Sequence, residues 1–202
     1  MAKAKKSKPK PVARRPARST RAAPTDAIAL LKADHRQVEE WFEQFENSGS
    51  NTRKQELARK VCQALKVHTQ IEEEIFYPSF LQATEEEDIH HEAEVEHEGA
   101  KRLIADIEAS SPDDDYFDAK VKVLSEMIKH HVNEEEQRGG MFAKARQSDM
   151  DLKELGERLA ARKEELMGEE DNTRESRAAR GNRKSTYKGA GTMLRASLTS
   201  HR

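Results

Sequence analysis

The sequence predicts an all-α protein, an up-down-up-down four-helix bundle flanked by basic disordered tails. Three observations predict it. Apolar residues recur at intervals of three or four in four separate stretches, residues 26–167 contain no strand-like alternation, and charge divides the 202-residue chain into three zones. Connections of about 6–9 residues between the four stretches are short enough to make neighbouring helices antiparallel.

Charge separates both ends of the chain from its middle. Residues 1–25 hold nine lysines and arginines and no acidic residue, and residues 173–202 hold eight against one glutamate. The residues between them carry a net charge of −18. Segments as polar as the two ends bury too little apolar surface to offset the entropy of ordering. We therefore predict a basic disordered arm over residues 1–24 and a basic disordered tail over residues 169–202.

Composition also excludes several classes of protein. No run of about 18 apolar residues occurs, so the sequence predicts no transmembrane helix and no membrane partner. The N-terminal arm lacks the apolar stretch of a secretory signal, and the single cysteine, Cys62, excludes an intramolecular disulfide and a cysteine-based zinc site. There is no glycine-rich phosphate loop and no GxSxG motif. We expect a reducing compartment and a cytoplasmic protein.

The first two predicted helices follow from their apolar faces. The first begins after Pro24 with Thr25 or Asp26 as its cap and ends at residues 47–50. Its face comprises Ile28, Leu31, His35, Val38, Phe42 and Phe45. The second is predicted to stop near Tyr77, because a following proline disfavours helical geometry. Its face comprises Val61, Leu65, His68, Glu72 and Ile75.

The remaining helices complete a predicted bundle over residues 25–148. The third face comprises Ala93, His97, Ala100, Ile104 and Ile107. Ser111 and Pro112 are predicted to cap and open the fourth helix. Its face comprises Val121, Leu124, Ile128, His131 and Glu135. The segment MFAKAR is predicted to continue this helix after a weak point at Gly139–Gly140. A short additional helix is predicted within residues 149–168.

Each of the four faces contains one histidine at mid-helix, and two faces also contain a glutamate. Glu72 follows His68 by four residues, and Glu135 follows His131 by four. Positions i and i+4 project to the same side of a helix, so each pair presents an imidazole and a carboxylate to one point. A single inward histidine is usually a hydrogen-bonded core residue, but four imidazoles and two carboxylates in one core are mutually costly without a cation. The pattern indicates one or two metal ions, and nitrogen and oxygen ligands suit iron, manganese or zinc.

Four segments resemble the hemerythrin-like HHE cation-binding domain family. They are ADHRQVEEWF, HTQIEEEIFYP, EVEHEGAKRLI and HHVNEEEQRGGMF, in this order on successive predicted helices within residues 26–148. The resemblance implies a non-haem di-iron centre, bridged by two carboxylates and an oxo or hydroxo group. Carried over position by position, it implies Glu72 and Glu135 as the bridges. The full set of implied metal ligands is His35, His68, Glu72, His97, His131 and Glu135.

The third helix departs from the oxygen-carrying hemerythrins, which have an HxxxH pair there. Ala93 and Lys101 stand four residues before and after His97, and His90 is two turns away, about 10 Å along the helix. One iron would therefore have an additional open or water-filled position. This difference favours sensing, iron handling, or peroxide or nitric-oxide chemistry over simple reversible oxygen storage.

Two alternatives remain open on the fourth helix. His130 and Glu134 also form an HxxxE pair, but we prefer His131 because it shares a face with the apolar residues of that helix. Glu136 can compete with Glu135, because hemerythrins proper place their last carboxylate five residues after the histidine.

Several neighbouring residues are assigned less specific roles. Glu73, Glu74 and residues 85–88 are predicted to lie on solvated faces. Asp34 is expected to point away from the core, with a hydrogen bond to an imidazole as the alternative. Tyr77 is expected to be a core packing residue.

These observations lead to three functional hypotheses. The preferred one is a di-iron protein that binds oxygen, nitric oxide or iron for sensing, storage or detoxification. The second is a metalloenzyme, for instance a catalase-like enzyme that removes peroxide at the open position. The third is a nucleic-acid-associated protein whose basic tails neutralise phosphates and release counterions.

Overall fold

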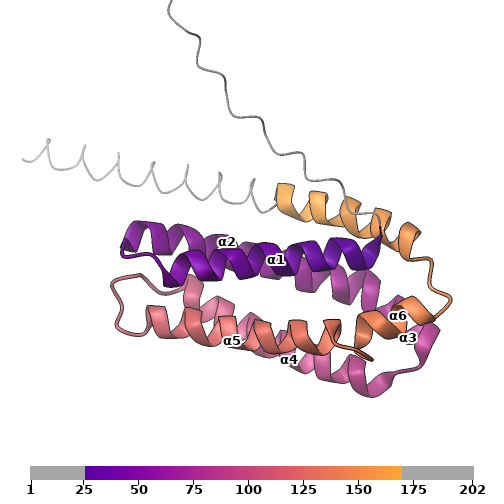
Figure 1. The fold of residues 1–202 in the computed structure, drawn as a ribbon. Helices are drawn as coiled ribbons and strands as arrows, with labels where there is room; N and C mark the ends of the chain where they lie inside the picture. Colours follow the sequence, from indigo (N-terminus) through magenta and orange to yellow (C-terminus); the bar gives the residue numbers. More distant parts are fainter. Residues whose placement is uncertain (1–25, 170–202) are drawn as a thin grey trace, which may run out of the picture.

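The computed structural model describes residues 26–169, and every regular element in this part of the chain is a helix (Figure 1). The predicted all-α class is therefore confirmed for these residues, whereas the predicted tails lie outside them, except that residue 169 is the last described residue of a helix. The elements are α1 (Ala27–Glu46), α2 (Asn51–Ile71), the π-helical turn η1 (Glu72–Phe76), α3 (Tyr77–Thr84), α4 (Glu87–Glu108), α5 (Phe117–Glu136), α6 (Met141–Gln147) and a helix over residues 152–169.

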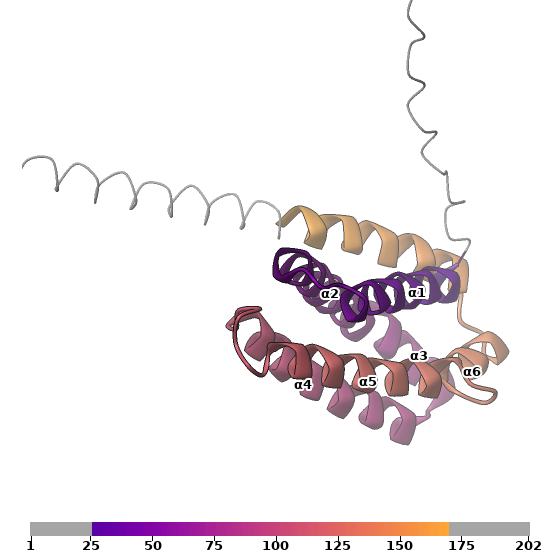
Figure 2. The ribbon, with the colours of Figure 1, turned by 60° about the vertical axis from the view of Figure 1, so that its left-hand side comes forward.

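The four long helices form two pairs. α1 lies along α2, α4 lies along α5, and the pairs meet through contacts of α1 with α5 and of α2 with α4. Figures 1 and 2 show α3 and α6 at one end of these pairs and the helix over residues 152–169 outside α1. That last helix comes very close to the start of α1. A Cβ atom on Gly156 would lie 2.7 Å from the backbone nitrogen of Ala27, so the contact requires glycine.

Side-chain caps start the first two long helices. Asp26 Oδ1 accepts a hydrogen bond of 2.8 Å from the backbone N–H of Ala29, which identifies Asp26 as the cap of α1. Ser50 caps α2 by accepting a hydrogen bond from the backbone N–H of Arg53. The connection over residues 47–50 turns α2 back along α1 (Figure 1).

The predicted end of the second helix near Tyr77 is wrong, because the chain remains helical through Pro78. The turn η1 joins α2 to α3, and the backbone N–H of Tyr77 donates to the carbonyl of Glu72, five residues earlier. In a regular α-helix a proline ring clashes with the carbonyl four residues before it, and the wider π-helical turn relieves that clash. Pro78 also lies in the first turn of α3, where its missing N–H costs little.

Two other predicted boundaries are wrong as well. The fourth helix starts at Phe117, because residues 111–114 form a turn in which the N–H of Asp114 donates to the carbonyl of Ser111. The segment MFAKAR forms the separate helix α6, because α5 ends at Glu136. Gly139, between α5 and α6, has a φ of +89°, a conformation that strongly favours glycine.

Two apolar clusters fill the interior, and a polar layer lies between them. One cluster joins the start of α1 to α3, α6 and the last helix, and the other lies near the connections over residues 47–50 and 109–116. Along α1 the first cluster ends at Leu31 and the second begins at Val38, with His35 between them. His97 lies in the same way between Ala93 and Ala100 on α4. The histidine layer therefore has an apolar region on each side.

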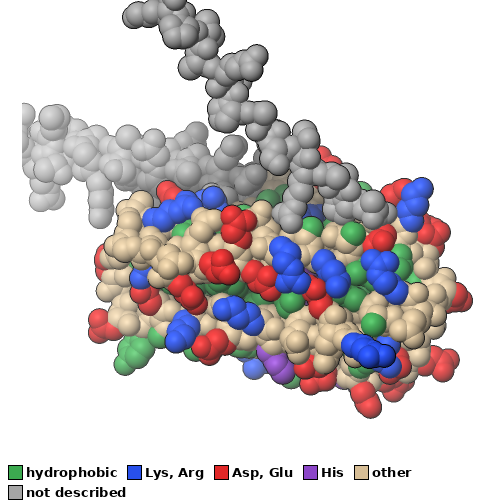
Figure 3. All heavy atoms as spheres, in the orientation of Figure 1, with side chains coloured by type: hydrophobic (Ala, Val, Ile, Leu, Met, Phe, Trp, Pro, Cys, Tyr) green, Lys and Arg blue, Asp and Glu red, His purple; other side chains and the backbone are tan. Residues whose placement is uncertain are grey.

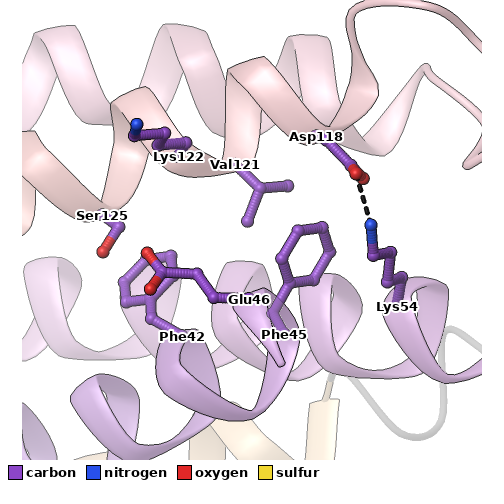
Figure 4. A pocket seen from close by; sticks show the side chains of 8 residues that line it. All are labelled: Phe42, Phe45, Glu46, Lys54, Asp118, Val121, Lys122 and Ser125. Carbon is purple, nitrogen blue, oxygen red and sulfur yellow. Dashed lines mark hydrogen bonds and ion pairs between the residues drawn. The ribbon is translucent and has the colours of Figure 1, made fainter. Parts of the chain in front are cut away.

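The surface carries charges of both signs. Figure 3 shows Lys and Arg side chains interspersed with Asp and Glu over the face formed by α1 and α5. A surface pocket of about 280 Å³ lies beside the second apolar cluster, where Phe42, Phe45 and Val121 line it and Lys54 forms an ion pair with Asp118 (Figure 4). The described residues that line this pocket include no histidine, so it lies apart from the histidine layer. Within residues 26–169, no helix has both the length and the apolar character needed to cross a membrane.

Candidate metal centre

The structure brings all six predicted ligand residues together between the two apolar clusters. α1 supplies one histidine, α2 and η1 supply a histidine and a glutamate, α4 supplies one histidine, and α5 supplies the last histidine and glutamate. These residues are His35, His68, Glu72, His97, His131 and Glu135. None of them is more than 4% exposed. Burial of six titratable side chains in one layer is the feature that needs a physical explanation.

The Nε2 atoms of the four histidines point into the centre as two pairs. His35 and His68 form one pair with 3.1 Å between their Nε2 atoms, and His97 and His131 form the other with 3.2 Å. We call these the α1–α2 half and the α4–α5 half of the centre. An Nε2–Nε2 contact this short holds at most one proton between the two nitrogens, so each half directs lone-pair density at a common point.

Each glutamate faces a histidine of both halves. Oε2 of Glu72 lies 3.2 Å from Nε2 of His68 and 3.5 Å from Nε2 of His97. Oε2 of Glu135 lies 3.4 Å from Nε2 of His35 and 3.7 Å from Nε2 of His131. Two carboxylates between two imidazole pairs form a donor set that suits two neighbouring cations.

The described residues contain two overlapping groups whose ligand atoms lie within 4.8 Å of one another. The α1–α2 half combines its two histidines with Glu72 and Glu135, and the α4–α5 half combines its two histidines with Glu72. Glu72 belongs to both groups. The two halves therefore differ in the number of close protein donors.

The π-helical turn brings Tyr77 to the centre. Its backbone bonds to Glu72 five residues earlier, so both side chains lie on the inner face. The Tyr77 hydroxyl lies 3.2 Å from Nε2 of His97 and donates to Oε1 of Glu135 at 3.3 Å. Tyr77 is buried, as predicted, but it also contacts two candidate ligands. The sequence interpretation missed this role, and Pro78 inside a helical pattern was the available signal of an irregular turn.

An outer carboxylate accompanies each of the four histidines. Nδ1 of His35 lies 2.8 Å from Glu136, Nδ1 of His97 lies 2.9 Å from Glu73, and Nδ1 of His131 lies 2.7 Å from Glu96. Asp34 is the corresponding neighbour of His68, at a longer distance of 3.7 Å. An Nδ1–H that donates to a carboxylate leaves the Nε2 lone pair free to bind a metal, an arrangement found around many metal-bound histidines.

Cationic side chains flank these outer carboxylates on the surface. Lys32 and Arg36 contact Glu136. Lys101 contacts Glu73, and Lys163 of the last helix contacts Asp34. Glu96 contacts the imidazole of His130 instead, at 3.3 Å. Each inner histidine therefore has a chain of polar partners that leads outward to the surface.

The structure places the alternatives left open by the sequence outside the inner layer. The side chain of His130 is 63% exposed, whereas the adjacent His131 faces the centre. Glu136 contacts Nδ1 of His35 rather than the interior. His90 packs edge-on against Tyr77 and belongs to neither candidate ligand group.

Two predictions about acidic residues need correction. Glu73 does not lie on a merely solvated face, because its carboxylate bridges His97 and Lys101. Glu96, which the sequence interpretation did not single out, bonds to His131 across two helices. The apolar spacing of α4 gave no indication that Glu96, one residue before His97, would contact a histidine. Glu74 and Glu86, by contrast, form surface ion pairs with Arg162 and Lys144.

The protein alone does not neutralise the charges of this centre. Glu72 has no exposed surface, and neither of its carboxylate oxygens accepts a hydrogen bond; Oε2 of Glu135 also lacks a donor. A buried carboxylate without a partner is strongly unfavourable. A cation bound between the imidazoles and carboxylates would remove that cost, and this donor set fits iron, manganese or zinc.

The pKa shifts have the same origin. Burial raises the pKa of Glu135, and the negative charge of Glu72 raises it further. Burial alone would lower the pKa of His68, but the charge of Glu72 one turn away raises it to about 10. The pKa of His131 is raised against the effect of burial by the charge of Glu135. Burial lowers the pKa of His35, and Glu39, one turn away on α1, pairs with Arg36 instead. Without a metal, Glu135 thus tends to hold a proton, whereas Glu72 stays ionised, because the charge of His68 lowers its pKa to about 2 against the effect of burial.

The fold and the site together define a helical metal-binding domain that uses histidine and carboxylate donors. Comparison with known families gives its class: residues 26–145 match the hemerythrin HHE cation-binding domain. The chain belongs to that family, which confirms the resemblance seen in the four sequence segments.

Two similar proteins extend the comparison. The chain is 30% identical over 107 residues to a DNA nickase from Nostoc sp. (strain PCC 7120 / SAG 25.82 / UTEX 2576). That match covers 53% of this chain and 30% of the relative, so the chain spans less than a third of the relative's length. The crystal structure of a hemerythrin HHE cation-binding domain-containing protein from Mycobacterium kansasii is similar with a TM-score of 0.60 and 22% identity, covering 71% of this chain and 88% of that one. This second similarity supports the fold.

Proposed function

We propose that the six buried side chains hold a pair of iron ions, and that this centre binds oxygen, nitric oxide or iron itself for sensing, storage or detoxification. The observation that carries the proposal is the carboxylate of Glu72. It is fully buried, it lacks a hydrogen-bond donor, and it faces one histidine from each half of the centre. A carboxylate in that position suits a bridge between two ions. Membership of a cation-binding family favours a metal, and manganese or zinc would accept the same donors.

Bound iron would supply redox chemistry and a coordination position for a small ligand. The side chains of the protein prepare the centre for it. The outer carboxylates of Glu136, Glu73 and Glu96 hold protons at Nδ1 of three histidines, which directs their Nε2 lone pairs inward. The apolar clusters on either side exclude bulk water and strengthen every electrostatic contact within the layer.

A small cavity beside the histidines supports a small ligand. It has a volume of about 10 Å³, and all four inner histidines contribute to its wall. Val38, Leu65, Ile128 and Val132 form much of the remaining wall. A space about as large as one water molecule favours a very small ligand and excludes an organic substrate.

The α4–α5 half favours chemistry at an open position over simple oxygen storage. Only one carboxylate, Glu72, joins its two histidines in a close donor group among the described residues. The Tyr77 hydroxyl lies next to it as a proton donor. This combination also supports the alternative of a peroxide-removing enzyme, which would turn over peroxide far faster than dissolved iron does.

The test is metal content per chain in anaerobically purified protein, followed by the visible spectrum on admitting air. We expect two irons per chain and the appearance of bands typical of a bridged di-iron centre. Removing the metal should also lower the melting temperature, because a ligand present at a hundredfold excess over its Kd stabilises the folded state by about 2.7 kcal/mol. For a domain of this size the decrease is on the order of 10 °C. Substoichiometric metal, or an unchanged melting temperature, would contradict the proposal.

Association with nucleic acid is a second candidate function. The basic ends of the sequence and the printed name of the Nostoc relative, a DNA nickase, favour it. The expected result is binding to duplex DNA that weakens steeply with salt and is lost when residues 1–24 are deleted. If binding survives this deletion, the contact with DNA lies elsewhere in the chain. If the full chain does not bind DNA, this candidate function is excluded.

A further inference from the structure

The four outer carboxylates differ in their surface partners. Asp34, Glu73 and Glu136 each contact a lysine or arginine on the surface. Glu96 contacts two imidazoles instead, Nδ1 of His131 at 2.7 Å and Nε2 of His130 at 3.3 Å. A cation that approaches the centre past the first three carboxylates meets a fixed positive charge. The side of the centre next to Glu96 lacks that barrier.

A surface pocket opens on this side. It has a volume of about 80 Å³ and lies where α4, the end of α5 and the start of α6 meet. Figure 1 shows these three elements together at one end of the molecule. Its wall includes four glutamates, Glu92, Glu96, Glu134 and Glu135, and no lysine or arginine is among the described residues that line it. We call it the acidic pocket.

The acidic pocket reaches the candidate ligands. His131 and Glu135 both line it, although each is less than a tenth exposed. Oε2 of Glu135 has no hydrogen-bond donor, so a buried carboxylate oxygen without a partner lies at the inner end of the acidic wall. The pocket therefore connects the surface glutamates with the centre.

Gly140 allows this pocket to take its shape. A Cβ atom at this position would lie 2.2 Å from the carbonyl oxygen of Glu134 and 2.9 Å from that of Glu135. Without a side chain, the turn before α6 can lie directly on the last turn of α5 and form one wall of the pocket.

We propose that the acidic pocket is the route by which a divalent cation reaches the metal centre, with Glu92 and Glu134 attracting the ion at the mouth and Glu96, His131 and Glu135 receiving it further in. The inference rests on the proposed metal centre and adds the path by which that centre is filled. Carboxylates concentrated at one opening raise the local concentration of cations and the rate of their capture. Glu92 and Glu134 thus govern the rate of loading, and the six inner residues govern how much metal is held.

The test is the rate at which the metal-free full chain takes up Fe²⁺ under anaerobic conditions. Timed samples receive an excess of chelator that binds free Fe²⁺, and protein-bound iron is then measured. The test variant combines Glu92→Gln with Glu134→Gln. Its matched control combines Glu94→Gln with Glu126→Gln, which removes the same charge from exposed positions on α4 and α5 outside the acidic pocket.

We expect the test variant to load about tenfold more slowly than the control at low salt, with the difference shrinking at about 0.5 M salt. The final iron per chain should be the same in both. Glu92→Lys should slow loading further, whereas Glu94→Lys should have little effect. Equal loading rates for the test variant and its control would overturn the access route, as would a lower final iron content in the test variant alone. Failure of the unmodified chain to hold iron would instead reject the proposed metal centre.

Discussion

The two halves of the candidate metal centre are built from the same kind of histidine pair, yet they differ in what surrounds it. In the α1–α2 half, His35 and His68 have both Glu72 and Glu135 within ligand distance. In the α4–α5 half, His97 and His131 have Glu72 as their shared close donor. The second half is also the one that contacts Tyr77 and borders the acidic pocket.

The difference follows from the position of Glu135, whose Oε2 lies 3.4 Å from Nε2 of His35 and 3.7 Å from Nε2 of His131, and α4 offers no further donor to compensate. The positions one turn before and after His97 are Ala93 and Lys101, so α4 contributes a single imidazole. Ala93 is buried in the first apolar cluster, and Lys101 extends outward to Glu73. The centre thus has one half well supplied with donors and one half with fewer, and reactivity toward a small ligand is expected at the second. Four experiments can break or sharpen this comparison.

The largest effect is expected from Glu72→Gln, because this residue belongs to both halves. The amide has nearly the same shape but carries no charge, so it removes the proposed bridge without creating a cavity. Even changes to residues that only support metal ligands lower metal affinity by about 10–100-fold, and loss of a ligand should cost more. Metal analysis should find both ions missing. The control is Glu74→Gln, at an exposed residue two positions later. If Glu72→Gln retains one ion, the two halves bind their metal ions independently.

The next effect concerns two adjacent histidines on α5. His131→Ala should abolish stoichiometric metal binding by removing a donor from the weaker half, as should His68→Ala in the other half. His130→Ala should leave binding largely intact, because that side chain is 63% exposed. Metal content measured on the three variants decides the register of α5. A site emptied by His130→Ala alone would show that the α5 interpretation is wrong.

These two experiments rest on what the sequence already indicated. The three- and four-residue spacing predicts which histidines lie inside, because a helix turns each residue by a fixed angle and an inward face is a local property. The structure indeed brings His35, His68, His97 and His131 into one layer. The HxxxE spacing likewise anticipates the inward positions of Glu72 and Glu135.

The features that the sequence did not reveal depend on more than one helix or on an irregular turn. Glu96 lies beside His131 only because α4 packs along α5, a contact between residues 35 positions apart. Glu73 follows an inward glutamate and has the pattern of a solvated residue, and only the neighbouring α4 gives it a histidine partner. Tyr77 reaches the centre through η1, which shifts the helical phase by one residue. Local periodicity carries no information about any of these three contacts.

A smaller effect is expected from pH. In the metal-free protein His68 has a pKa raised to about 10, and the pKa values of His131 and Glu135 are also raised. These groups bind metal only after losing their protons, so metal binding should release protons and its affinity should increase with pH. Below the raised pKa values, each displaced proton changes the apparent affinity about tenfold per pH unit. Calorimetric titrations in buffers of different ionisation enthalpy measure the number released. Because His68, whose pKa is raised to about 10, belongs to the α1–α2 half, binding there should be the more pH-dependent of the two. Metal affinity independent of pH would contradict this assignment.

The smallest effect is expected from Tyr77→Phe, and it should fall on His97 of the α4–α5 half and on Glu135. The ring remains in the apolar cluster, but the hydroxyl that contacts His97 and donates to Glu135 is lost. Because Tyr77 is not one of the six donors, two metal ions per chain should still bind. A hydrogen bond of this kind contributes about 1 kcal/mol, so the affinity of the loaded centre for nitric oxide should fall about fivefold. The measurement is a nitric-oxide titration followed by visible absorption, with Tyr116→Phe, an exposed tyrosine in the connection before α5, as the control. An unchanged affinity would mean that the ligand binds away from Tyr77, and the better-supplied α1–α2 half would then be the reactive one.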